Sequence, residues 1–333
     1  MKILSTASIS RPNNDAMIRV LCGNLAEHAR AVDLVVVADE DANRSAFLRY
    51  GIRLPPFSKA PSNSRIDHKR YRSWLVAPLH DNLRAAVLTF EPIFYETLVV
   101  AFRYLFDSFV QLVSGERLPD VKTAALPVLL AGTGGVAVGD AARPLVRGLI
   151  HWLAIGVPLE RVDLVVSELV DATLVSGVLQ EEMASYLESP IATRRSPRYD
   201  VFVSYSRHDS TGIEIVTGKL RELWLDVRIF RDVDSLRAGG IWQHELFLAI
   251  DASRVVLAVL SEDYLASQVC IEEYNIAMIR ARQDRANVLF PVLLDDTPLP
   301  SYMQLRQFVD CRPRDRVKLQ QMCATLRQIL LQS

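Results

Sequence analysis

Two adjacent glutamates, Glu272 and Glu273, are the side chains best suited to chemistry, because a carboxylate fixed beside a cleft can stabilise developing positive charge. The pattern around them predicts a helix. At about 100° of rotation per residue, its apolar side chains fall on one face within about 100°, namely Cys270, Tyr274, Ala277, Met278 and Ala281. Glu272 is predicted to project into solvent opposite this face, whereas Glu273 lies near its border. We therefore predict that Glu273 is the functional carboxylate.

The second half of the chain also predicts the elements that position this carboxylate. Helical patterns alternate with short apolar runs at residues 201–205, 226–230, 255–260, 288–294 and 308–310. Strands that are apolar on both faces and separated by helices form a parallel sheet covered on both sides. Ligands bind such sheets in the crevice at the carboxyl ends of the strands. The candidate binding residues at these ends are Tyr205, Ser206, Phe230 and Arg231.

Several segments of this half resemble the TIR (Toll/interleukin-1 receptor) family, in the family's order, over residues 199–333. They are residues 199–206, Arg231-Asp232 followed by Gly239-Gly240, and residues 261–267, 270–273, 291–294 and 308–310. The resemblance implies a compact parallel α/β domain. An unrelated flavodoxin-like domain is the alternative.

The resemblance also implies an activity, cleavage of the bond between nicotinamide and ribose in NAD. The family's catalytic glutamate lies three residues after its cysteine, which corresponds to Glu273. Nicotinamide leaves as a neutral molecule, so the difficulty is the positive charge that develops on the ribose, and a fixed carboxylate stabilises that charge. The implied NAD-binding residues are Tyr205, Ser206, Phe230, Arg231, Asp232, Gly239 and Gly240, the two glycines lying in a loop that covers the nucleotide.

One position departs from the enzymatic members of the family. Many of them carry a tryptophan four residues before the glutamate, where this chain has Val269. Valine offers neither an aromatic face nor an indole donor, and Trp242 is expected to pack in a helix instead. Two interpretations therefore stay open: an NAD hydrolase that acts on self-association, and a non-catalytic scaffold that binds other TIR domains.

The first 187 residues predict a second α/β domain with a doubly wound parallel sheet. Strand-like runs lie at residues 2–4, 32–38, 85–89, 124–131 and 162–166, and helical patterns lie at 16–30, 97–113, 141–154 and 170–187. Residues 188–198 contain two prolines and three arginines, and we interpret them as a linker. The predicted organisation is thus a domain at 1–187, a linker at 188–198 and a TIR domain at 199–333.

This first domain resembles the NADPH-dependent FMN reductase family, whose flavodoxin-like fold binds flavin with three loops. The matching residues are Ser8, Ser10, Arg11, Asn13 and Asn14 in a phosphate loop, Pro92, Phe94 and Tyr95 beside the ring, and Gly132, Thr133, Gly134 and Gly135 in a glycine-rich loop. The resemblance implies FMN as a cofactor. Two features depart from it, because Ser8-Ile9 replaces the family's Gly-Ser pair and Glu96 stands where a small residue is common. A flavin-dependent reductase and a domain that regulates the TIR domain by assembly both stay open.

Composition narrows the partners. The 38 lysines and arginines nearly balance 39 aspartates and glutamates, so a nucleic-acid partner is not expected. No apolar run approaches the roughly 20 residues of a membrane helix, and the four cysteines and six histidines form no metal-binding pattern. We expect a cytoplasmic protein without a metal that self-associates through both domains. By analogy with the family, it would serve prokaryotic immunity or stress signalling.

Overall fold

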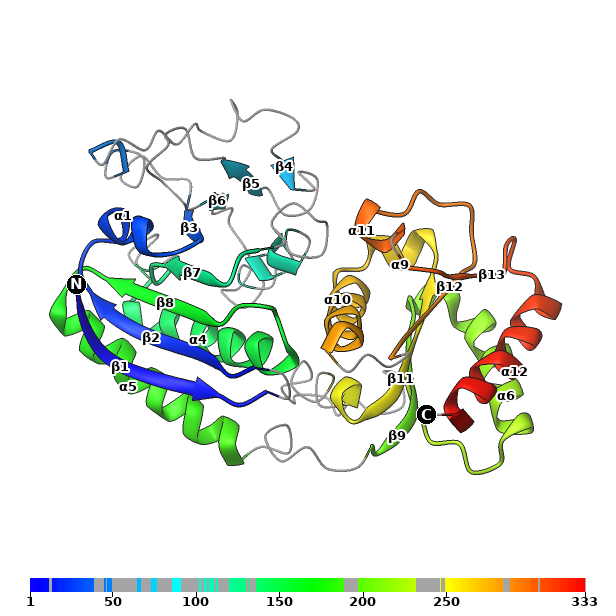
Figure 1. Ribbon diagram of the computed structural model, residues 1–333. Helices are drawn as coiled ribbons and strands as arrows, with labels where there is room; N and C mark the ends of the chain where they lie inside the picture. Colours follow the sequence, from blue (N-terminus) through cyan, green and yellow to red (C-terminus); the bar gives the residue numbers. More distant parts are fainter. Residues whose placement is uncertain are drawn as a thin grey trace. The chain divides into compact units, whose positions relative to one another are not determined.

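A computed structural model of the chain falls into two compact units, residues 1–189 and 190–333 (Figure 1). The division lies inside the segment 188–198 that the sequence predicts as a linker. The structure describes residues 1–11, 14–38, 45, 47–49, 65–66, 73–76, 86–90, 102, 105–106, 108–110, 112, 120–129, 131, 136–188, 197–231, 246, 249–283, 288–304 and 306–332.

The first unit is built on a mixed eight-stranded sheet. Its strands are β1 (Lys2–Ile9), β2 (Ala16–Cys22), β3 (Leu34–Ala38), β4 (Arg65–Ile66), β5 (Ser73–Val76), β6 (Ala86–Phe90), β7 (Thr123–Leu126) and β8 (Arg161–Val166). They are ordered β1-β2-β8-β7-β3-β6-β5-β4. The central strands from β2 to β6 run parallel, whereas β1, β5 and β4 join by antiparallel pairing.

The helix predicted over residues 16–30 is wrong. Residues 16–22 form β2, in which Ala16, Ile18 and Val20 are buried while Met17 is exposed, the alternation of a strand with one buried face. Gly23, at φ 156°, then leads into the short helix α1 (Leu25–His28) and the 3-10 turn η1 (Ala29–Ala31). The α/β class of this unit is confirmed. The predicted flavodoxin-like arrangement is not confirmed, because β1 and β2 form a hairpin where a helix was predicted.

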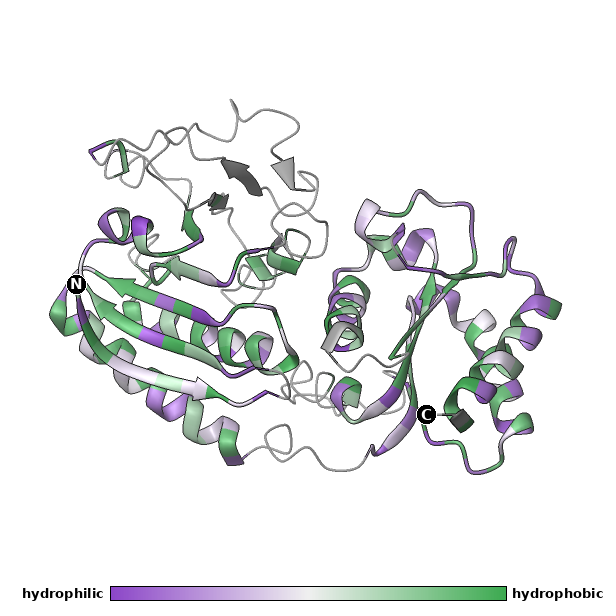
Figure 2. Ribbon diagram, in the orientation of Figure 1, coloured by the Kyte–Doolittle hydropathy of each residue, from purple (hydrophilic) through white to green (hydrophobic). Residues whose placement is uncertain are grey.

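Two long helices among the described residues lie against this sheet. They are α4 (Val138–Ile155) and α5 (Leu169–Glu188), which pack against each other and against β1 and β2 (Figure 1). Helix α4 ends at Gly156, whose φ of 107° suits a residue without a Cβ atom. The core lies between these layers, and Figure 2 shows its mainly green, apolar strands interrupted by purple, hydrophilic stretches in β2 and β8.

The second unit has a fully parallel sheet of five strands. In the order β10-β9-β11-β12-β13, these are β10 (Ile229–Arg231), β9 (Tyr199–Ser204), β11 (Ser253–Leu260), β12 (Leu289–Leu293) and β13 (Val309–Asp310). All five predicted strands are present, β10 beginning at Ile229 rather than at residue 226. The parallel direction brings the carboxyl ends of all strands to one edge of the sheet.

Helices cover this second sheet. The 3-10 turn η5 (Arg207–Asp209) leads into α6 (Ser210–Leu223), which packs with α12 (Arg316–Gln332) over a shared apolar core. Helices α9 (Glu262–Ala266), α10 (Gln268–Gln283) and α11 (Ser301–Gln304) follow β11 and β12. Figure 1 shows α9 and α10 on one side of the strands and α6 and α12 on the other.

Candidate functional site

The carboxylate of Glu273 lies against the end of strand β9, which pairs with β10 and β11. Its Oε2 atom accepts a hydrogen bond of 2.5 Å from the hydroxyl of Ser204, the last residue of that strand. The Ser204 Oγ atom lies 2.8 Å from the hydroxyl oxygen of Tyr264 on α9. All three side chains are buried, and Glu273 is 3% exposed. The contact places this glutamate at the carboxyl edge of the sheet.

The hydrogen count fixes the direction of these bonds. A serine hydroxyl has a single hydrogen, and Ser204 donates it to Glu273. Tyr264 must therefore donate its own hydrogen to Ser204. Burial raises the pKa of Tyr264 well above its ordinary value, and nearby Cys270 and Glu273 raise it further, so this tyrosine remains a donor. The result is a relay in which Tyr264 donates to Ser204 and Ser204 donates to the carboxylate.

The predicted exposure of Glu272 is wrong. Its side chain is 2% exposed, so burial does not distinguish it from Glu273. The prediction assumed a helix with one buried face, but α10 is also buried at Ile271, Asn275 and Ile276, outside the predicted stripe. What distinguishes Glu273 is its bond to the end of β9.

Strand alternation separates the side chain of Tyr205, which the sequence placed in the crevice with Glu273, from that of its neighbour Ser204. Ser204 faces α10, whereas Tyr205 packs with Val201 and Val203 in the core beneath α6 and α12. The main chain of Tyr205 meets the α10 side, since its carbonyl oxygen accepts from the Cys270 Sγ atom at 3.4 Å. The prediction that the Tyr205 side chain lines the same crevice as Glu273 is therefore wrong.

The other predicted residues of this site have varied positions. Phe230 is buried and stacks on Phe202, with ring centroids 5.2 Å apart, so it packs within the sheet. Ser206 is buried and caps η5 by accepting from the His208 amide. Arg231 ends β10 and is half-buried. Asp232, Gly239 and Gly240 lie outside the described residues, as does Trp242, whereas Val269 is half-buried on α10.

Sequence reasoning missed Ser204 and Tyr264 as members of the site. The available signal was a polar residue at the last position of an otherwise buried strand, where a side chain must find a partner inside the sheet's cover. For Tyr264 the signal was weaker, because an aromatic residue in a short helix most often serves packing.

The predicted phosphate loop of the first unit has a different structure. Ser8 lies within β1, opposite Met17, and the chain continues into β2 rather than into a helix. Among the described residues 1–11 and 14–22 no helix begins, so this stretch shows no helix start whose amides could serve the predicted anion site, and FMN binding stays a prediction. Arg11 instead donates to the carbonyl oxygens of Asn14 and Val157, each at 2.7 Å.

The remaining predicted residues of this loop add no evidence for a phosphate or flavin site. Ser10 and Asn14 belong to the connection between β1 and β2. The other predicted flavin contacts lie outside the described residues: Asn13, Pro92, Phe94, Tyr95, Gly132, Thr133, Gly134 and Gly135.

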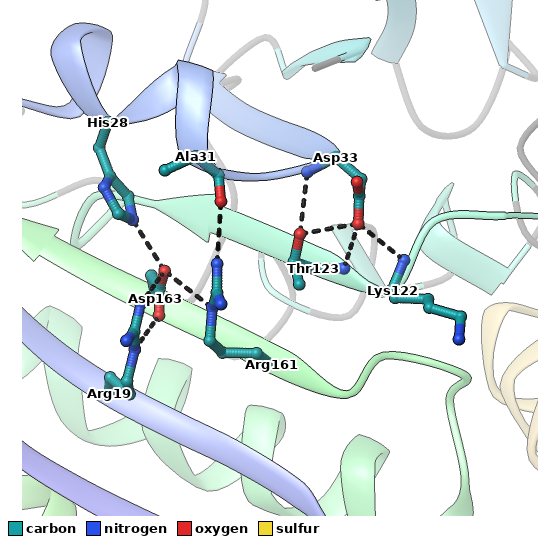
Figure 3. Close-up of polar contacts among 8 residues, drawn as sticks. All are labelled: Arg19, His28, Ala31, Asp33, Lys122, Thr123, Arg161 and Asp163. Atoms are coloured by element: carbon teal, nitrogen blue, oxygen red, sulfur yellow. Dashed lines mark hydrogen bonds and ion pairs between the residues drawn. The ribbon is translucent and has the colours of Figure 1, made fainter. Parts of the chain in front are cut away.

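In the first unit, an ionic cluster forms around the buried Asp163 (Figure 3). Both oxygens of this β8 carboxylate accept from Arg19 at 2.7 Å, and Oδ2 also lies 2.7 Å from His28 Nε2 and 3.2 Å from Arg161 Nε. Burial alone would raise the pKa of Asp163, but hydrogen bonds from His28 and Arg19 and the arginine charges outweigh it and lower the pKa. The carboxylate is therefore charged and fully compensated.

This cluster lies near the amino ends of the parallel strands. Arg161 begins β8, and Thr123, which bonds with Asp33 in Figure 3, begins β7. Ligand sites of parallel sheets form at the opposite, carboxyl ends. We therefore assign the Asp163 cluster to folding, since it joins α1, β2 and β8.

In the described part of the chain, no three or more side chains of His, Cys, Asp or Glu are grouped closely enough to hold a metal ion. Within the same residues, every helix falls short of the length or apolar content needed to cross a membrane.

Comparison with known proteins gives a match for the second unit. A family model described as TIR domain matches residues 201–323. The disease resistance protein RPV1 of Vitis rotundifolia is 32% identical over 116 residues, which are 34% of this chain and 8% of that protein. The chain thus spans a small part of this curated relative.

Two kinds of solved structure are also similar. The TIR domain of the Toll-related receptor TRR-2 from Hydra magnipapillata is 20% identical, with a TM-score of 0.33, and covers 39% of this chain and 98% of its own. A mutant macrodomain of Oceanobacillus iheyensis is 14% identical, with a TM-score of 0.39, covering 56% of this chain and 99% of its own. At these values neither structure informs the function of the chain.

Proposed function

Residues 201–323 are a TIR domain, and from that premise we propose that the chain cleaves the nicotinamide–ribose bond of NAD+ with Glu273 as the catalytic carboxylate. One observation carries the proposal. The Glu273 carboxylate is buried at the carboxyl edge of the parallel sheet and is held there by the hydroxyl of Ser204, itself held by Tyr264. An acidic group in that place matches the chemistry that this cleavage requires.

The relay prepares the carboxylate for the transition state. Nicotinamide is already cationic on its ring nitrogen and departs neutral, so the leaving group requires no proton. Positive charge grows on the ribose instead, and a carboxylate whose orientation is fixed beforehand stabilises it without reorganisation. Ser204 and Tyr264 supply that orientation from two different elements, β9 and α9.

A non-catalytic TIR scaffold is the second candidate. The observation that favours it is Val269, half-buried on α10 at the position where many NAD-cleaving relatives have tryptophan. Without an aromatic face there, the site offers less surface against which a nicotinamide ring can stack. Such a scaffold would bind other TIR domains and leave NAD intact.

The test is incubation of the full chain with NAD+ and chromatography of the products. Glu272→Gln is the matched control for Glu273→Gln, because both glutamates are buried neighbours on α10 and both changes preserve shape. We expect Glu273→Gln to lower turnover at least about 100-fold, the effect of removing a key electrostatic group, and Glu272→Gln to retain most activity. Equal losses would refute the assignment, and absence of turnover at every protein concentration would favour the scaffold.

We further propose that the first unit regulates this activity. Enzymatic TIR domains resembling this one act after self-association, and a folded unit attached to the TIR domain can raise its local concentration by pairing. A cytoplasmic role in prokaryotic immunity or stress signalling belongs to the same proposal.

A further inference from the structure

A second group of bonds lies at the carboxyl edge of the TIR sheet and centres on Arg314. This residue follows β13 and has a φ of 54°, a left-handed conformation that is uncommon outside glycine. Its guanidinium binds both oxygens of Asp295, Nε at 2.8 Å and Nη2 at 2.6 Å, while Nη1 lies 2.8 Å from Asp209 Oδ1. Two carboxylates therefore hold the guanidinium, while the Arg314 amide donates to the Leu294 carbonyl at 3.0 Å.

Asp209 connects the half-exposed Arg314 to the buried residues of the sheet edge. Its side chain is fully buried, whereas that of Arg314 is 47% exposed, so the arginine brings compensating charge from the surface to a buried carboxylate. The other Asp209 oxygen accepts from the Ser261 hydroxyl at 2.5 Å. Ser261 comes directly after β11 and gives its single hydrogen to Asp209, which leaves its oxygen lone pairs to accept from elsewhere.

The amide of Tyr264 uses that oxygen. It donates to Ser261 Oγ at 2.9 Å, which makes Ser261 the N-cap of α9. Helix α9 has only five residues, so its placement depends strongly on its cap. Tyr264 is thus held at its main chain by Ser261, and its hydroxyl holds Ser204 and, through it, Glu273.

These contacts form one continuous chain from the surface to the carboxylate. It runs through Arg314, Asp209, Ser261, Tyr264, Ser204 and Glu273. We propose that Arg314 is a positioning residue for Glu273, acting through Asp209 and the cap of α9. Its catalytic consequence rests on the proposed function, whereas its effect on α9 does not.

The same turn supplies a matched control. Arg312 donates to both oxygens of Asp310 in β13 and to Asp296, which follows β12. It therefore also joins the turn after β13 to the end of a neighbouring strand. Its bonds go to Asp310 and Asp296, not to Asp209. Arg312→Met and Arg314→Met therefore each remove an arginine that pairs with two carboxylates, but only Arg314→Met breaks the series of contacts that leads to Glu273.

The first readout is amide hydrogen exchange in the full chain, which requires no activity. Arg314→Met should speed exchange across residues 262–266 about tenfold or more, and Arg314→Lys, which keeps the charge, should speed it less. Arg312→Met should leave that segment unchanged. Equal exchange in the two methionine variants, or an unchanged segment in Arg314→Met, would overturn the inference.

The second readout is NAD cleavage. If the chain is active, Arg314→Met should lower kcat about tenfold with KM within about twofold, because a misplaced carboxylate weakens transition-state binding more than substrate binding. Normal kcat in an Arg314→Met protein with disturbed α9 would overturn the catalytic part. If the wild type cleaves no NAD, the proposed function fails, and exchange alone decides whether Arg314 positions α9.

Discussion

At the scale of single residues, the buried Glu273 carboxylate needs compensation that the apolar interior does not supply. Moving a charge out of water costs several kcal/mol unless hydrogen bonds replace its hydration. Ser204 provides one such bond, and its position is fixed because its strand pairs with β11 at Ala258. Tyr264 then satisfies the serine. The site is thus built from buried side chains whose main chains belong to β9, α9 and α10.

This arrangement predicts a graded response to removal of the two hydroxyls. Ser204→Ala deletes the donor to the carboxylate and should lower kcat for NAD about 10- to 100-fold, with a loss of about 1–3 kcal/mol in the free energy of unfolding. Tyr264→Phe deletes only the more distant hydroxyl and should have a smaller effect on kcat. Steady-state kinetics and urea unfolding measure both. A larger kinetic loss in Tyr264→Phe would be incompatible with the relay.

At the scale of elements, the Asp163 cluster joins a short helix and two strands that would not be stable in isolation. Helix α1 has four residues, too few for stability in isolation, and its buried His28 binds Asp163 at 2.7 Å. Arg19 on β2 binds the same carboxylate. One buried charge therefore fixes a short helix and the register of two neighbouring strands.

Asp163→Asn should cost about 3–5 kcal/mol, because it leaves the half-buried Arg19 and Arg161 without their buried counter-charge. The pKa of Asp163 is lowered in the folded state, so its contribution is complete above the unfolded value of about 3.9 and is lost as pH falls below it. The stability gap between wild type and variant should therefore be widest near pH 7 and narrow below about pH 4. Urea unfolding at several pH values measures this gap.

Asp33→Asn is the control for this prediction. Asp33 accepts from Thr123 and the Lys122 amide at the same end of the sheet; these donors are neutral, and the nearby Arg161 charge acts on Asp33 more weakly than they do. Its replacement should cost only about 1 kcal/mol. A similar cost for the two variants, or a gap for Asp163→Asn that widens in acid, would show that the cluster does not act through its charge.

At the scale of the whole molecule, the chain consists of two units that meet in sequence at residues 189 and 190. The amides of Arg198 and Tyr199 both donate to the carbonyl of Ala252, at 2.7 Å and 3.0 Å, so the TIR unit is already formed at Arg198. Bonded main chain resists proteases. The protease-sensitive boundary between the two units is therefore expected to lie before residue 198.

Limited trypsin treatment should therefore cut first after Arg194 or Arg195 and spare Arg198. Two fragments that resist further digestion should remain, each with a cooperative unfolding transition. Mass spectrometry of the first products identifies the site. A first cut within either unit, with neither half surviving, would contradict independent folding.

If both fragments fold, their separation tests the regulatory proposal. Residues 190–333 alone should show NAD cleavage that rises steeply with protein concentration, whereas the full chain should stay active at low concentration because pairing keeps TIR domains close. Activity assays over a dilution series compare the two. If the isolated TIR unit is as active as the full chain at low protein concentration, the proposal of regulation by assembly is refuted.

Local patterns in the sequence predicted the TIR sheet well, because its strands are apolar on both faces and are separated by clear helical periods. They failed at residues 16–22, where the alternation of Ala16, Ile18 and Val20 was taken for part of a helix. They also failed for Glu272, because burial on several faces of α10 depends on what surrounds the helix.

The relay and its extension were beyond sequence reasoning for a different reason. Ser204, Tyr264, Glu273 and Arg314 come from separate elements, and no local pattern marks which of them touch. Resemblance to the TIR family pointed to Glu273 alone. The partners that hold it follow from the order of strands and from the caps of short helices, which only the folded chain displays.

The most direct test of the central claim is single-turnover release of nicotinamide with the full chain in excess over NAD+. Excess protein saturates binding and assembly, so the rate reports the chemical step. We predict that the wild type releases nicotinamide and that Glu273→Gln releases it at least about 100-fold more slowly, while still binding NAD+. Equal rates for the two proteins, or no release by the wild type at any concentration, would contradict the account.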